Sequence, residues 1–124
     1  LVMDGAVSIP EYDLANYNIG YAHFERKEKE DYTNANIAFR KYLLSKNLTD
    51  LNKKADANLR AADCYFMNNT FPQAADLYKE AITLNKLDVD YAIYQKGMCL
   101  GVMKKYKEKI KDHHHTQKSI QNFS

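Results

Sequence analysis

The 124-residue chain has few of the residues that interrupt helices, with only four glycines and two prolines. Sheets built from many short strands need more turn residues, so this composition favours helices. No apolar run approaches the roughly 20 residues of a membrane-spanning helix, and no secretory signal peptide or glycine-rich phosphate loop is recognisable. The formal charge is only +2. Basic and aromatic residues do not gather on one helical face, which disfavours nucleic-acid binding.

The chain also lacks the side-chain groupings typical of catalysis. Neither cysteine has a histidine within a helical turn in sequence. Carboxylates such as Asp88 and Asp90 fall where helices are expected to begin, where they complement the helix dipole. Three consecutive residues, His113, His114 and His115, point about 100° apart on a helix and cannot all bind one metal ion. We therefore expect no enzyme activity, no metal site and no cofactor.

What the chain does contain is a pattern of small and aromatic residues that occurs three times. Its members are Gly20, Tyr32, Ala35, Phe39 and Tyr42 in the first copy, Ala62, Phe71, Ala74, Tyr78 and Ala81 in the second, and Gly97, Tyr106, Lys109, His113 and Thr116 in the third. From the aromatic residue onward, the first two copies are 39 residues apart and the last two are 35 apart. A period of about 34 to 40 residues is typical of a helical repeat array.

Each copy is expected to form two amphipathic helices joined by a short turn. In the second copy, Ala55, Leu59 and Ala62 recur at helical spacing. The turn follows at residues 68–70, with Thr70 as the N-cap and Pro72 in the first turn of the next helix. In the third copy we expect the turn near residues 104 and 105.

The first copy contains two insertions, both in connectors. Three extra residues lie in the charged stretch 25–31, and we expect them to extend the first helix from about Glu11 toward Lys29. A second insertion falls in the polar stretch 45–54, between successive helix pairs. Repeat arrays tolerate insertions at such places. The apolar stretch 1–9 is expected to be part of a further element before Pro10.

Small residues recur because the two helices of a pair approach closely only where side chains are small. We expect Gly20 to meet Ala35 and Ala62 to meet Ala74, with Gly97 in the same role in the third copy. The two cysteines occupy equivalent positions in copies two and three. Helix packing would separate them by about 10 Å, whereas a disulfide needs Cα atoms within about 7 Å. Both cysteines are therefore expected to be reduced and buried.

These residues resemble the tetratricopeptide repeat family, whose signature combines small residues in both helices with aromatic residues between them. The second copy matches best, through Ala62, Tyr65, Ala74, Tyr78 and Ala81. The first copy departs from the pattern at His23 and Tyr42. The third departs at Lys109, His113 and Thr116, and the usual closing proline is absent from all three. Residues 55–82 are also similar to bacterial cell-envelope repeat proteins of the TolA-binding and outer-membrane assembly lipoprotein type.

The resemblance implies an all-α superhelix of about three helix hairpins, with repeats at approximately 12–46, 54–86 and 89–122. It makes residues 1–124 one domain, which we expect to be a fragment of a longer chain. A periplasmic or cell-envelope location in a bacterium is implied by the resemblance alone.

In the family, the first helix of each pair lines the concave face. By position this implies a surface of Tyr17, Tyr21 and Phe24 from the first copy, Leu59, Asp63, Phe66 and Met67 from the second, and Tyr91, Tyr94, Met98 and Val102 from the third. Such a surface suits a helix or an extended apolar peptide. The clamp that binds acidic chaperone tails needs lysine and asparagine at these positions, so that ligand is disfavoured. These side chains either contact a partner or pack against one another and against repeats outside the chain.

We therefore expect a non-catalytic scaffold that binds a protein or peptide partner through the concave face. The alternative is a structural spacer whose repeats pack against other parts of the same longer protein, with no external ligand. Neither alternative involves nucleic acid or insertion of this segment into a membrane.

Overall fold

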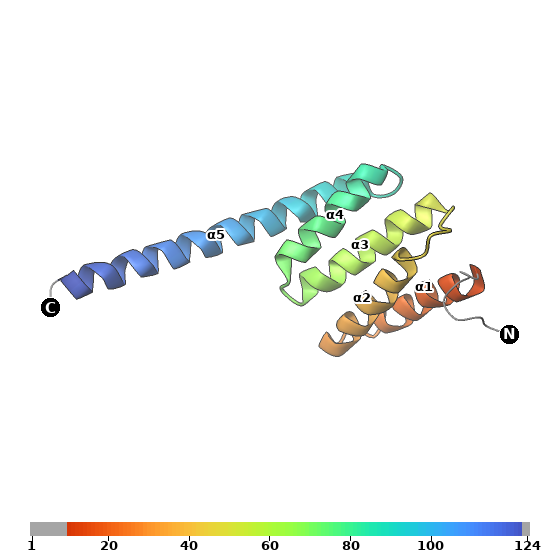
Figure 1. The fold of residues 1–124 in the computed structure, drawn as a ribbon, viewed down its shortest axis with the longest axis horizontal. Coiled ribbons are helices and arrows are strands. Elements are labelled where there is room, and N and C mark those ends of the chain that lie inside the picture. Colours follow the sequence, from red (N-terminus) through yellow and green to blue (C-terminus); the bar gives the residue numbers. More distant parts are fainter. Residues whose placement is uncertain (1–9, 123–124) are drawn as a thin grey trace.

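The computed structural model describes residues 10–122, with side chains described for residues 12–112. The chain is all-α. Its helices are α1 (Pro10–Phe24), α2 (Lys29–Leu43), α3 (Leu51–Met67), α4 (Phe71–Leu84) and α5 (Val89–Asn122). Each helix packs against the next one in the sequence as an antiparallel neighbour, and α1 also touches α3 (Figure 1). The expected element at residues 1–9 lies outside the described residues.

The turn expected near Lys104 and Lys105 does not form, so the prediction of a third helix hairpin is wrong. The described part of the chain has five helices rather than the six expected. Helix α5 continues through this point to Asn122, and its second half extends beyond the other helices (Figure 1). Residues 102–112 are mostly lysine, methionine and glutamate, which favour helix. The small residue that would hold a returning helix is replaced by Lys109. Nothing in this stretch therefore favours a turn.

The extra residues in the first connector lengthen α2 rather than α1. Helix α1 ends at Phe24, and Lys27 follows with a left-handed φ of 63°. Helix α2 then begins at Lys29, three residues before Tyr32, whereas α4 begins at Phe71, the equivalent of Tyr32. Two acidic residues, Glu30 and Asp31, lie in the first turn of α2 and favour a helix start there.

The second connector follows the prediction more closely. The insertion between helix pairs is confirmed as the stretch 44–50, and Pro72 lies in the first turn of α4 as expected. The turn before α4 places Asn69 in the left-handed region, with φ 60°. Thr70 is the N-cap residue, but its hydroxyl does not cap α4 and instead donates to the Asn68 carbonyl at 3.3 Å.

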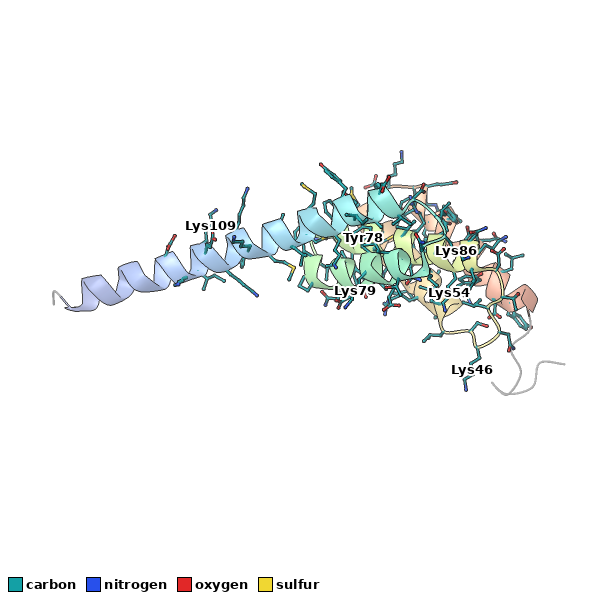
Figure 2. All side chains as sticks on the ribbon, turned by 90° about the horizontal axis from the view of Figure 1, so that it is seen from above. Lys46, Lys54, Tyr78, Lys79, Lys86 and Lys109 are labelled. Carbon is teal, nitrogen blue, oxygen red and sulfur yellow. The ribbon has the colours of Figure 1, made fainter. Side chains whose placement is uncertain are left out.

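The repeated small and aromatic residues of the first two copies form the core. Ala35, Ala62 and Ala74 are fully buried, and so are the equivalent aromatic residues Phe39 and Tyr78. Tyr78 lies within the helix bundle in Figure 2. The cysteines are free and buried, as expected. The repeated small and aromatic residues of these two copies are therefore the residues that pack between successive helices.

Gly20 is a point of close approach between α1 and α2, and the atoms nearest to it belong to the Phe39 ring. A Cβ atom added at Gly20 would lie 2.7 Å from the Phe39 ring. Gly97 is different, because it is exposed and a Cβ atom there would meet nothing within 4 Å. The expected role of Gly97 at a helix crossing is wrong, since no second helix returns to cover it.

The two glycines therefore predict opposite effects of the same substitution. Gly20→Ala should destabilise the chain by about 1–2 kcal/mol, because overpacking against a buried ring outweighs the better helix propensity of alanine. Gly97→Ala should stabilise it by about 0.5–1 kcal/mol through propensity alone. Urea unfolding followed by circular dichroism measures both changes. Equal effects at the two positions would contradict the packing of α1 on α2.

Candidate partner-binding groove

A groove of about 280 Å³ lies where α1, α2, α3 and α5 meet. Helix α3 forms its base, and the ends of α1 and α5 form opposite walls. We call it the α3 groove, and its lining residues are Phe24, Tyr32, Arg60, Asp63, Phe66, Met67, Tyr91 and Gln95. Aromatic and aliphatic side chains thus surround one arginine and one aspartate.

The polar base of the groove belongs to a row of charged residues along α3. Asp56, Arg60 and Asp63 are spaced four and three residues apart, so they share one face of the helix. Arg60 lies between the two carboxylates. Its Nη1 atom is 3.1 Å from Asp63 Oδ2, and its Nε atom is 3.6 Å from Asp56 Oδ1. Both contacts are ion pairs between partly buried side chains.

Each carboxylate of this row also accepts hydrogen bonds from two tyrosines. The hydroxyls of Tyr17 and Tyr21, both from α1, donate to Asp56, with 2.6 Å between Tyr17 Oη and Asp56 Oδ2. The hydroxyls of Tyr78 and Tyr91 donate to Asp63, with 2.7 Å between Tyr91 Oη and Asp63 Oδ1. The network therefore ties α3 to α1 on one side and to α4 and α5 on the other. We call it the tyrosine–carboxylate network.

Arg60 is held between aromatic rings as well as between acids. Its guanidinium carbon lies 5.9 Å from the ring centroids of both Phe24 and Tyr91. Among the described side chains, its Nε is a buried nitrogen without a hydrogen-bond partner. The guanidinium is thus held at the base of the α3 groove by acids and aromatic rings together.

Burial dominates the protonation of these groups. Burial, and then the hydrogen bond to Asp63, raise the pKa of Tyr91 to about 12. Burial likewise raises the pKa values of Tyr17, Tyr21 and Tyr78, with the neighbouring carboxylates adding to the effect. Burial also raises the pKa of Asp63, against the opposing effects of Arg60 and the two tyrosine hydroxyls. At neutral pH the tyrosines therefore stay protonated and act as donors.

The raised tyrosine pKa values predict a loss of stability in alkali. A group whose pKa is higher in the folded chain stabilises it fully below the unfolded-state pKa, and this contribution is lost as the pH rises through the folded value. For Tyr91 that window runs from 10.0 to about 12. We expect the free energy of unfolding to fall across this window, and to fall less steeply in Tyr78→Phe. Urea unfolding at several pH values measures the slopes, and parallel curves for the two chains would contradict the network.

The α3 groove brings together five of the residues expected on the concave face: Phe24, Asp63, Phe66, Met67 and Tyr91. Tyr17 and Tyr21 are half-buried and pack on the core beside Phe39. Leu59 is fully buried in the core, so it offers no surface to a partner in this structure.

The remaining expected residues lie further along α5. Tyr94 is 65% exposed, and Met98 and Val102 are also exposed. Val102 lines a different groove, which it shares with the first turn of α4. The side chains of His113, His114 and His115 lie outside the described residues, so the expected core role of His113 stays a prediction.

Sequence reasoning missed Asp56 and Arg60. The available signal was the spacing of Asp56, Arg60 and Asp63 over two helical turns in an otherwise apolar stretch of α3. Such a row on a helix face that is expected to be covered predicts buried ion pairs, because buried charges are paired. The partner tyrosines come from three other helices and carry no equivalent signal.

Within residues 10–122, none of the helices is both long and apolar enough to cross a membrane. Among the described side chains, no group of three or more histidine, cysteine, aspartate or glutamate residues could hold a metal ion. Comparison of the chain with protein-family models, with curated proteins and with solved structures finds no match.

Proposed function

We propose that this chain is a non-catalytic protein-binding module of the tetratricopeptide type, which binds an apolar helix or peptide segment in the α3 groove. The observation that carries the proposal is the groove itself. It gathers aromatic and aliphatic side chains from α1, α2, α3 and α5 around a fixed arginine. Ligand sites commonly combine an apolar lining with a few oriented polar groups.

The chemistry of the lining favours an apolar ligand with one carbonyl or hydroxyl group placed at the arginine. Arg60 is flanked by two carboxylates, Asp56 and Asp63, so the base of the groove does not carry excess positive charge. A fully anionic ligand would be repelled by these acids. A neutral acceptor, such as a peptide carbonyl, can approach the guanidinium without that repulsion.

Exposed apolar side chains continue from the groove along α5. Met67 is 54% exposed at one wall, and Tyr94 and Met98 follow Tyr91 on the same side of α5 by helical spacing. Tyrosine and methionine are effective contact residues, because tyrosine covers a large area at low entropy cost and methionine adapts its shape. We propose that a bound segment covers these side chains.

A display library of random 16- to 20-residue peptides, a length of about 24–30 Å as helix, tests the proposal without a known partner. The immobilised 124-residue chain should enrich peptides rich in aliphatic and aromatic residues. Binding of an enriched peptide should fall about tenfold or more in the double variant Met67→Ser, Tyr94→Ala, because central contact residues carry most binding energy. The variant Ile37→Ser, Leu44→Ser removes exposed apolar side chains elsewhere and serves as the matched control.

The spacer alternative gives the opposite result. A segment whose grooves are filled by other parts of a longer protein should enrich no peptide that depends on Met67 and Tyr94. Equal loss of binding in the Ile37, Leu44 control would also reject the α3 groove, since it would indicate general adhesion to apolar surface.

A further inference from the structure

A second apolar surface runs along α5 beyond the first turn of α4 (Figure 1). Within the bundle, α5 packs on α4 through Ala92 and Cys99, which are fully buried. The same helical face continues at three- and four-residue spacing as Met103, Tyr106 and Ile110. Tyr106 and Ile110 are 67% and 57% exposed. We call Met103, Tyr106 and Ile110 the α5 stripe.

The α5 stripe begins in a groove rather than on an open surface. A cavity of about 440 Å³ lies between the first turn of α4, at Phe71 and Pro72, and the α5 residues Val102, Met103 and Tyr106. The interface between α4 and α5 therefore continues past the start of α4 into a groove with the same apolar face at its base. This continuity indicates that a further helix can pack there as α4 does.

Lysines flank the stripe on both sides. By helical register, Lys107 and Lys111 lie on one side and Lys109 on the other, whereas Lys105 lies on the far side of the helix near Asp112. Lys107 also lines the groove at the start of the stripe. Figure 2 shows Lys109 on the part of α5 that projects beyond the bundle. Of the two acids of this segment, Asp112 lies on the far side of the helix. Glu108 lines a surface hollow with Met103, where Lys104, Lys107 and Lys111 outnumber it.

This arrangement selects among the possible occupants. A second copy of the chain would place lysines against lysines, and the repulsion between these like charges disfavours it as the occupant. A membrane surface calls for a broad apolar face, whereas the stripe is about one side chain wide. An amphipathic helix with an apolar seam and acidic flanks matches both the shape and the charge.

We propose that the α5 stripe binds an acidic amphipathic helix of a partner protein, which packs beside α5 in line with α4. Its apolar seam covers Met103, Tyr106 and Ile110. Its carboxylates face the flanking lysines. This site is separate from the α3 groove, and either can fail without the other.

The test uses two synthetic helical peptides with the same leucine seam at three- and four-residue spacing. One carries glutamate at the flanking positions and the other carries lysine. Fluorescence anisotropy against the 124-residue chain should show binding of the glutamate peptide alone. The affinity should weaken several-fold when the salt concentration rises from about 0.05 M to about 0.5 M, because salt screens exposed charges.

Variants locate the site. The double variant Tyr106→Ser, Ile110→Ser should lose about tenfold or more in affinity for the glutamate peptide. The variant Lys107→Glu, Lys111→Glu should lose it as well and gain binding of the lysine peptide. Leu44→Ser changes an exposed apolar residue at the end of α2, outside both the stripe and the α3 groove, so it should bind like the unaltered chain. Because these side chains are exposed, circular dichroism should show unchanged helix content.

Four results would overturn the proposal. The first is no binding of the glutamate peptide, and the second is equal binding by the Tyr106, Ile110 variant. The third is binding to vesicles of anionic lipid through the stripe without binding of the peptide. The fourth is self-association in sedimentation that the Tyr106, Ile110 variant abolishes, which would assign the stripe to a second copy.

Discussion

The chain with Phe39→Ala is expected to lose about 3–5 kcal/mol of its free energy of unfolding, the range for removing a buried phenylalanine. The Phe39 ring is fully buried and lies edge-on to Tyr21, with 5.1 Å between ring centroids. It also contacts Tyr17 and Phe24 and fills the space left by Gly20. Its removal would open a cavity between α1 and α2. Urea unfolding at neutral pH measures the loss.

A control on the same helix separates this packing from helix propensity. Ile37 lies two residues earlier on α2 and is 39% exposed, so Ile37→Ala should change the stability by less than about 1 kcal/mol. A second comparison isolates the contact with α1. Gly20→Ala should cost less in a Phe39→Leu chain than in the unaltered one, because contacting residues couple. Similar losses for Phe39→Ala and Ile37→Ala would contradict the packing described here.

The second large effect is expected at Asp63, where replacement by alanine should cost about 3–5 kcal/mol, the range for breaking a buried ion pair. Asp63 accepts hydrogen bonds from Tyr78 and Tyr91 and pairs with Arg60. Without the carboxylate, the buried hydroxyl of Tyr78 loses its acceptor and Arg60 loses its closest acid. Chemical unfolding followed by circular dichroism measures the loss.

Asparagine at the same position distinguishes hydrogen bonding from charge. Asp63→Asn keeps an oxygen that can accept from both tyrosines, so it should be less destabilising than Asp63→Ala. Asp76 is an exposed acid on α4, and Asp76→Ala should change the stability by less than about 0.5 kcal/mol. A loss at Asp63 no larger than the loss at Asp76 would reject the tyrosine–carboxylate network.

The first four helices could be predicted because their sequence pattern reports local packing. Ala35, Ala62, Ala74 and Ala81 are small because two helices meet there, and all four are fully buried. The pairing of each helix with the next also follows from short connectors. Such contacts join neighbouring elements, so their spacing is visible in one sequence.

The prediction of a third helix pair was wrong because a repeat pattern does not by itself make a turn. The pattern continues through Gly97 and Tyr106, yet residues 102–112 form good helix and contain neither proline nor asparagine. Gly97 lies on the open side of α5, where small size has no packing role. The structure of residues 102–112 therefore follows from local helix propensity and not from the repeat pattern.

The candidate site could be predicted only in outline. The family layout identified Phe24, Phe66, Met67 and Tyr91, which do line one groove. It could not show that Leu59 is turned fully into the core, because that depends on the exact rotation of α3. Nor did it identify Arg60 as the base of the groove, since the rings that hold it, Phe24 and Tyr91, come from helices far apart in the sequence.

The continuity of α5 past Lys104 and Lys105 separates this fold from a third helix hairpin and underlies the α5 stripe, and one distance measures it. Spin labels at Ile93→Cys and Lys111→Cys, with Cys64 and Cys99 replaced by alanine, would lie on the same side of α5, because 18 residues make five helical turns, about 27 Å. Double electron–electron resonance should therefore give one distribution centred near this value, widened by the label arms. A hairpin that turns at Lys104 and Lys105 would bring the two positions to about 12 Å, one helix-packing distance plus an offset of five residues along the axis. That short distance would contradict the structure of α5 and remove the basis of the α5 stripe.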